Sequence, residues 1–325
     1  MADTAAAVVH IGEALNLTLV VLLVALVAKG RATGREGIVP ALVAGGIMVA
    51  PVPGANATLM LANPDHLATQ IPLLVVWLIL DRARPRWWVP VTVAALLAWA
   101  RVSDTIVLLE AEIPLLAVCA VRVYRWPRPL RARWYDLSLA AAAVAAEAIA
   151  ALVLRMIKDA GGFTAYPLRE TFADVSMLSS HVWTTAESVL DLYGADFSGQ
   201  PLQASTALYT PAAHLAGVLL AAVATVFAVR RFFTSDLMIQ VLTASIVTSL
   251  LAYTLLDNPT AGGGAHNLMP VLPPGDASIW ITFGRRAFGA QAQTYTVDGA
   301  QILVWRHNLL RSDLVTVPSA RPSAC

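Results

Sequence analysis

A series of long apolar runs constrains this chain more than any other feature of its sequence. The core of a lipid bilayer is about 30 Å thick, so a helix needs about 20 consecutive apolar residues to cross it. Eight runs approach that length: 10–28, 38–53, 64–80, 88–103, 105–121, 137–157, 211–229 and 236–256. The sequence therefore predicts an all-α polytopic membrane protein with about eight transmembrane helices, within a range of roughly six to ten.

The composition excludes most other classes of protein. Hydrophobic residues make up 58% of the chain and charged residues only 13%, whereas a soluble domain is typically about 25% charged. The net charge of +1 gives no indication of nucleic-acid binding. The two cysteines, Cys119 and Cys325, and the six histidines lack the paired spacing of a metal site built from protein ligands.

The distribution of basic residues predicts the orientation in the membrane. Cytoplasmic loops collect Lys and Arg, and here these residues follow the first, third, fifth and seventh runs. They are Lys29, Arg31, Arg35, Arg82, Arg84, Arg86, Arg122, Arg125, Arg128, Arg131, Arg133, Arg230 and Arg231. We therefore expect a multi-pass protein of the plasma (cytoplasmic) membrane with both termini outside the cytoplasm.

The chain divides into three parts by composition. Residues 1–256 form the predicted helical bundle, which includes a long outer loop at 158–210. Residues 257–284 are rich in Gly and Pro, which predicts an irregular outer loop. In residues 285–325, the pair Asp298-Gly299 stands between β-branched and aromatic residues, which predicts a small extracytoplasmic β hairpin.

The long outer loop contains the pattern of an amphipathic helix. Apolar residues recur at helical spacing at Leu178, Val182, Trp183, Ala186, Val189, Leu190 and Tyr193, opposite a polar face. Two positions for this helix stay open from the sequence. It lies either on the outer surface of the membrane or against the transmembrane bundle, and the absence of Lys and Arg from its polar face leaves the choice undecided.

The start of the third run combines a helix cap with reactive side chains. Asn63 is a suitable cap residue and Pro64 suits the first helical position. Asp65 then falls in the first turn, where the helix dipole favours a carboxylate, and His66 follows it. An acid or base at this point could meet a substrate arriving from the outer leaflet. The alternative is that Asp65 only stabilises the helix end.

Several ionisable residues fall inside the predicted spans. Glu147 lies in an alanine-rich run, where an unpaired carboxylate costs at least about 2.5 kcal/mol, so it should face the interior, be protonated or have a partner. Glu110 and Glu112 lie about 200° apart on an α-helix, so at most one should face that interior. Arg101 and Asp104 have the i,i+3 spacing of a helical ion pair. These residues form either a polar pathway or a neutralised structural network.

Five segments carry a resemblance to a known family. They are Asn63 to Pro72, Leu80 to Pro90, Asp104, Leu192 to Pro201 and Ile302 to Leu310. In these segments the chain resembles bacterial membrane glycosyltransferases of the GT-C type. The resemblance implies transfer of a sugar from a polyprenyl-phosphate donor to a cell-envelope acceptor on the extracytoplasmic face, within the lipid bilayer. The one cofactor it implies is a divalent cation near the phosphate.

The resemblance also implies site residues. Asp65 would be the general base, His66 would contact the phosphate, and Asp196 or Asp104 would shape the acceptor site. The chain departs from the family because the loop after its first run, residues 29–37, is short and basic, whereas the family has a large outer loop with a key carboxylate there. Either the chain is a shortened or degenerate relative, or Asp65 takes over that role.

Two other functions stay open from the sequence. A transporter would use Glu147, Glu110 and the Gly- and Pro-containing second run to line a site near the middle of the membrane. A catalytically inactive scaffold would bind a cell-envelope partner through its outer loop and hairpin.

Overall fold

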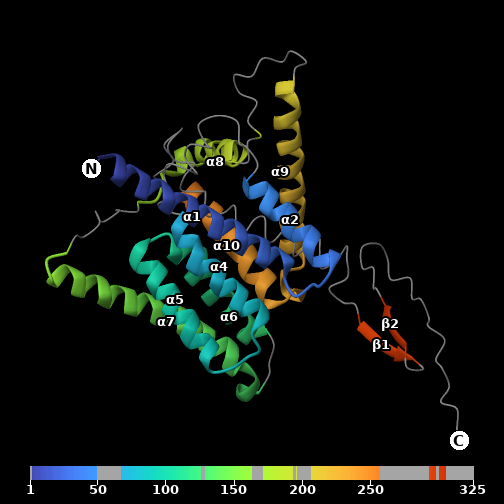
Figure 1. Ribbon diagram of the computed structural model, residues 1–325. Helices are drawn as coiled ribbons and strands as arrows, with labels where there is room; N and C mark the ends of the chain where they lie inside the picture. The colour runs from blue at the N-terminus through green and yellow to red at the C-terminus, as the bar shows by residue number, and fades with distance from the viewer. Residues whose placement is uncertain are drawn as a thin grey trace, which may run out of the picture.

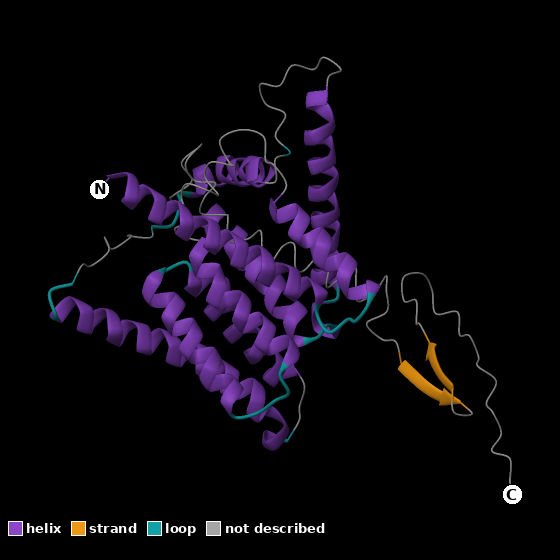
Figure 2. Cartoon of the chain, in the orientation of Figure 1, coloured by secondary structure: helices purple, strands orange, loops and turns teal. Residues whose placement is uncertain are grey.

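The computed structural model of the chain is built mainly of helices (Figures 1 and 2). It describes residues 2–49, 67–125, 129–162, 171–192, 195, 206–256, 293–297 and 300–304. The α-helices in these ranges are α1 (Ala2–Lys29), α2 (Arg35–Val49), α4 (Leu67–Arg82), α5 (Trp88–Ser103), α6 (Ile113–Arg125), α7 (Leu130–Asp159), α8 (Leu178–Leu192), α9 (Thr206–Arg230) and α10 (Leu237–Leu255).

Shorter elements connect or follow these helices. A single π-helical turn, η1 (Leu108–Glu112), leads into α6, and 3₁₀ turns η2 (Val175–Met177) and η3 (Phe232–Thr234) precede α8 and α10. Strands β1 (Gln293–Val297) and β2 (Ala300–Val304) pair antiparallel, with Tyr295 opposite Ile302. Asp298 and Gly299 lie outside the described residues, so the predicted turn stays a prediction.

The apolar runs are helical over most of their described residues; the fifth begins with a turn at Thr105 and Ile106. The fourth run, 88–103, has the same bounds as α5, because Asp104 leaves the helical conformation directly after it. Within the described ranges, three helices are long and apolar enough to cross a membrane: Ile11–Lys29, Arg133–Asp159 and Leu237–Leu255. The number of crossings and their direction stay predictions.

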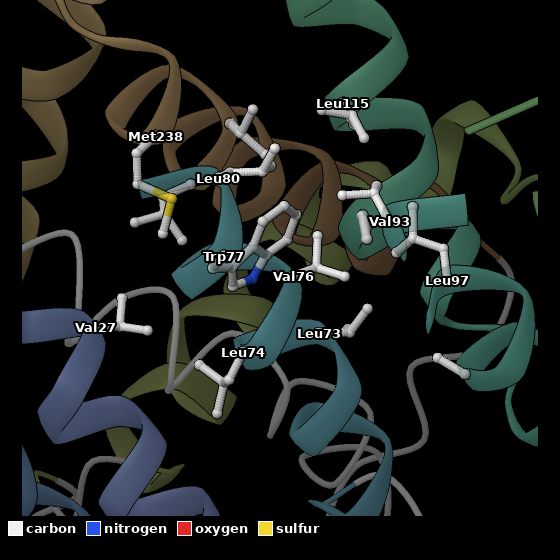
Figure 3. Packing of buried hydrophobic residues seen from close by; sticks show 14 of the residues in the cluster. Val27, Leu73, Leu74, Val76, Trp77, Leu80, Val93, Leu97, Leu115 and Met238 are labelled. Carbon is white, nitrogen blue, oxygen red and sulfur yellow. The ribbon is translucent and has the colours of Figure 1, made fainter. Parts of the chain in front are cut away.

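Helix α4 lies at the centre of the bundle and contacts α1, α5 and α10. Leu73, Leu74, Val76 and Trp77 lie on the side of this helix that faces the bundle, and each is at most 1% exposed (Figure 3). Ile71, Val75, Leu78 and Ile79 on the opposite side are only partly buried. The third run, which the sequence marks as an unbroken apolar stretch, therefore forms the core of the molecule.

Helix α8 confirms the predicted helix in the 158–210 segment. It lies across the C-terminal end of α10 (Figure 1) and contacts that helix. The turn before it begins at Asp174, whose carboxylate accepts hydrogen bonds of 2.9 Å from the backbone N–H and the hydroxyl of Ser176. These hydrogen bonds hold the pKa of the Asp174 carboxyl below its usual range.

Candidate functional site

The polar residues that the sequence placed inside the apolar runs gather around η1. We call Gln70, Arg101, Glu110, Glu112 and Glu147 the η1 cluster. They come from α4, α5, η1 and α7, so four elements supply one group of side chains. A π-helical turn is rare and often marks a functional site. The η1 cluster is therefore the first candidate for function among the described residues.

Asp104 lies at the edge of the η1 cluster and closes α5. Its backbone N–H donates to the carbonyl of Ala100 at 2.9 Å, and its carboxylate Oδ1 accepts from the backbone N–H of Ile106 at 3.0 Å. Its second carboxylate oxygen accepts from the hydroxyl of Thr69, 3.3 Å away in the first turn of α4. Asp104 thus both ends one helix and contacts the start of another.

The other predicted site residues cannot be placed beside Asp104. Asp65, His66 and Asp196 lie outside the described residues. Their convergence with Asp104 stays a prediction.

Glu110 is buried between α4 and α10. Its side chain, 1% exposed, accepts a 2.8 Å hydrogen bond from the amide of Gln70, and its backbone carbonyl accepts from the hydroxyl of Ser245. The second carboxylate oxygen of Glu110 and the amide oxygen of Gln70 have no hydrogen-bond partner in the described part of the chain. The hydrogen-bonding groups of this pair are therefore only half satisfied, and each unpaired buried acceptor costs about 1–3 kcal/mol.

Glu112 lies on the other side of η1, towards an ion pair between α5 and α7. Arg101 donates to Glu147 in a bidentate arrangement, at 2.8 Å from Nε and 3.3 Å from Nη2. Glu112, 3% exposed, is attracted by Arg101, and it lies close enough to Glu147 for the two carboxyl groups to share a proton in a hydrogen bond. One guanidinium therefore faces two carboxyl groups.

Glu110 and Glu112 lie on different sides of η1, as their spacing predicted, and both are buried because η1 is enclosed by α5, α6, α7 and α10. One prediction was wrong. Arg101 pairs with Glu147 of α7, whereas its local spacing pointed to Asp104. Arg101 therefore pairs with a residue of a neighbouring helix and not with a residue of its own helical turn. Of the three alternatives predicted for Glu147, the structure shows the third, a partner.

The charges of the η1 cluster are not balanced by its described members. It contains three carboxyl groups and one guanidinium. The side chain of Glu147 is 42% exposed, but Glu110 and Glu112 are buried, and burial makes an uncompensated charge costly. Such a group can hold a proton or bind a cationic or hydroxyl-bearing ligand. Among the described residues, no group of three His, Cys, Asp or Glu side chains is arranged to hold a metal ion.

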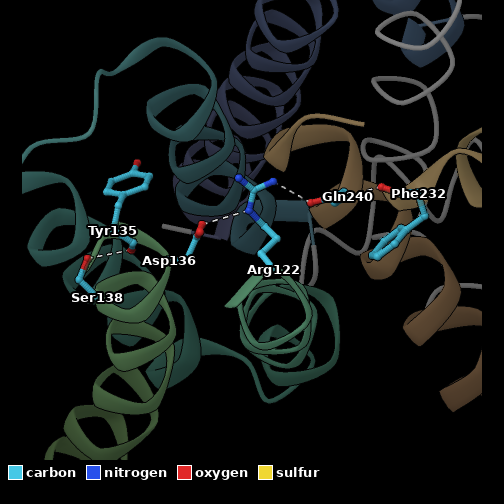
Figure 4. A network of polar contacts seen from close by, with 6 residues as sticks. All are labelled: Arg122, Tyr135, Asp136, Ser138, Phe232 and Gln240. Carbon is cyan, nitrogen blue, oxygen red and sulfur yellow. Dashed lines mark hydrogen bonds and ion pairs between the residues drawn. The ribbon is translucent and has the colours of Figure 1, made fainter. Parts of the chain in front are cut away.

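A second polar network lies near the other end of α6 (Figure 4). Arg122 donates to Asp136 of α7 at 3.0 Å and to the side-chain oxygen of Gln240 of α10 at 3.1 Å. The amide of Gln240 then donates to the carbonyl of Phe232 at 2.7 Å. We call these four residues the Arg122 network. Sequence reasoning missed it, although a glutamine near the start of an apolar helix was a usable signal.

Comparisons of this chain with models of protein families, with curated proteins and with solved structures give no match.

Proposed function

We propose that the protein is a membrane glycosyltransferase that takes a sugar from a polyprenyl-phosphate donor on the extracytoplasmic face. The observation that carries the proposal is the contact between two segments of the GT-C resemblance. Thr69 of the Asn63 to Pro72 segment donates a hydrogen bond to Asp104, which is itself one of the five segments. Gln70 of the same segment donates to Glu110, which lies outside them. Segments that are far apart in the sequence therefore share one polar region at the start of α4.

The proposed chemistry is an acid–base displacement at the sugar. Asp65 removes the proton from an acceptor hydroxyl, the oxygen attacks the anomeric carbon, and the bond from that carbon to the phosphate oxygen breaks. Polyprenyl phosphate leaves with the electron pair of that bond, and His66 contacts its phosphate. Asp104, held by Thr69 and the backbone of Ile106, orients the acceptor, and Asp196 is the second candidate for that role.

The test is release of polyprenyl phosphate by the protein reconstituted in vesicles, with a panel of polyprenyl-phosphate monosaccharides and a cell-envelope fraction as acceptor. We expect Asp65→Asn to reduce the release rate by about 10²-fold or more, the usual contribution of a general base. Asp104→Asn should reduce it less, since asparagine keeps the acceptor oxygen that Ile106 needs.

Asp236→Asn is the matched control for these variants. Asp236 also caps a helix, since its carboxylate accepts from the N–H of Ile239 at 3.0 Å, but it lies at the start of α10 beside the Arg122 network. This variant should release polyprenyl phosphate at the wild-type rate. The proposal is wrong if wild-type protein releases none, or if Asp65→Asn is as active as wild type.

One observation favours a transporter as the second candidate. Glu110 and Glu112 are buried in an apolar bundle and keep unpaired oxygens within the described ranges, and ionisable residues at such positions often lie on proton or ion pathways. A transporter predicts proton or solute flux across proteoliposomes that Glu112→Gln abolishes. Flux without sugar transfer would select this candidate, and neither activity would select the inactive scaffold.

A further inference from the structure

Helix α8 is attached to α10 by polar contacts, which is unusual for an amphipathic helix on an apolar bundle. The ring Nδ1 of His181 lies 3.2 Å from the carbonyl of Thr254, and the hydroxyls of Thr185 and Thr254 are 3.1 Å apart. The hydroxyl of Ser188 lies 3.2 Å from that of Tyr253. His181 and Thr185 are buried. Val189 also packs against the hydrophobic core, so the docked side of α8 combines these polar contacts with one apolar contact.

The angular positions of the remaining residues divide the free surface of α8 into two flanks. Taking His181 as the origin and about 100° per residue, Thr185 lies at about 40° and Ser188 at about −20°. Val182, Ala186 and Trp183 follow at about 100°, 140° and 200°. All three are exposed, Val182 to 57% and Trp183 to 67%. They form the apolar flank of α8, which Ser179 interrupts in the first turn.

The other flank of α8 is polar. Glu187, Ser180 and Thr184 lie at about 240°, 260° and 300° on the same scale, and the first two are exposed. The helix thus has three sides: a docked side, an apolar flank and a polar flank. A helix at a membrane boundary meets the protein, the lipid and the water on three such sides.

The segment before α8 connects α8 to the C-terminal end of the apolar helix α10. Ala173 donates its N–H to the carbonyl of Leu255 at 2.9 Å, and Phe172 forms a β-bridge with Leu256. Leu255 is the last residue of the Leu237–Leu255 helix, which is long and apolar enough to cross a membrane. Phe172 and Val175 are themselves 80% and 81% exposed. Exposed apolar residues therefore continue from α8 to the point where α10 ends.

We propose that the apolar flank of α8 inserts into the bilayer interface beside the end of α10, with acyl chains against Val182 and Trp183. Tryptophan is enriched at this depth in membrane proteins. Residues 171–192 contain no Lys or Arg and carry Asp174, Glu187 and Asp191, so anionic head groups do not attract this segment. The insertion is driven by apolar area alone, and it needs membrane insertion of the bundle but not sugar transfer.

Site-directed spin labelling tests this insertion. In a background of Cys119→Ala and Cys325→Ser, single cysteines replace Val182, Trp183 or Glu187, and the labelled protein is reconstituted in phosphatidylcholine vesicles. Oxygen reaches labels in lipid, and a water-soluble nickel chelate reaches labels in water. We expect a severalfold higher oxygen-to-nickel accessibility ratio at 182 and 183 than at 187. Adding phosphatidylglycerol should leave all three ratios unchanged.

Two results would overturn the proposal. Equal ratios at the three positions would place the apolar flank in water, and labels at 182 and 183 shielded from both reagents would mean that a protein covers it. Trp183→Phe without any label gives a second measurement if a cysteine variant does not fold. Brominated acyl chains quench the fluorescence of tryptophans that lie in lipid, and the chain has nine tryptophans. If Trp183 is inserted, Trp183→Phe should lower the fraction of the total fluorescence that is quenched. An unchanged fraction contradicts insertion.

Discussion

The η1 cluster and the Arg122 network are both polar groups in an apolar helical bundle, but they are satisfied to different degrees. In the Arg122 network, no buried polar atom of Arg122, Asp136 or Gln240 lacks a partner. In the η1 cluster, one oxygen each of Glu110 and Gln70 has no partner in the described part of the chain, and Glu112 has only the carboxyl of Glu147, with which it must share a proton. Both groups join three or more elements, so size does not explain the difference.

This difference separates architecture from function. A fully satisfied buried network stabilises one arrangement of helices, whereas a partly satisfied one costs stability. A protein tolerates that cost where the unpaired groups serve another purpose. We therefore assign the Arg122 network to holding α6, α7 and α10 together. We assign the η1 cluster to activity, because it borders Asp104 of the proposed sugar-transfer site and would be the ion pathway of the transporter candidate.

Replacing Arg122 by Met should have the largest effect on stability. It leaves Asp136 buried without its ion-pair partner, which costs about 3 kcal/mol or more. The unfolding temperature in detergent should fall more than in any variant of the η1 cluster. The double variant Arg122→Met with Asp136→Leu should recover part of the loss, because it also removes the stranded charge. No recovery would mean that the ion pair is not the source of the effect.

The two buried glutamines provide a matched comparison of smaller size. Gln240→Leu removes the acceptor for Arg122 and the donor to Phe232, at a cost of about 1–3 kcal/mol. Gln70→Leu removes one hydrogen bond to Glu110, but it also removes an amide oxygen that has no partner in the described residues. Thermal unfolding should therefore rank Gln240→Leu as the more destabilising variant. If Gln70→Leu were the more destabilising variant, the η1 cluster would be as structural as the Arg122 network.

Glu112→Gln should have the smallest effect on stability and the opposite sign. It removes an uncompensated carboxylate, so the protein should become more stable by about 1 kcal/mol, as often happens when a functional group is replaced. If the protein is a transporter, this variant should abolish proton or solute flux. Glu187→Gln on the exposed side of α8 is the control and should change neither quantity. A destabilised Glu112→Gln variant would show that the cluster is structural.

The helices could largely be predicted from the sequence, because their signal is local. An apolar run of bilayer length specifies a helix whatever surrounds it, and a residue such as Asp104 ends that helix by bonding to its own backbone. The bounds of α5 and the presence of α8 followed in this way. The side of α8 that docks could not be predicted in this way. The helical pattern favours burial of the apolar side, whereas His181 and the hydroxyls of α8 bond to α10.

The sequence by itself determined that this chain is mostly helical and that ionisable residues interrupt its apolar runs. The sequence predicted about eight spans, and three of the described helices are long and apolar enough to cross a membrane. Only the tertiary structure decided which of the residues that interrupt the apolar runs meet. Gln70 and Glu110 are 40 positions apart, Arg101 and Glu147 are 46 apart, and Arg122 and Gln240 are 118 apart. Helix packing brings such pairs together, and local spacing carries no information about it.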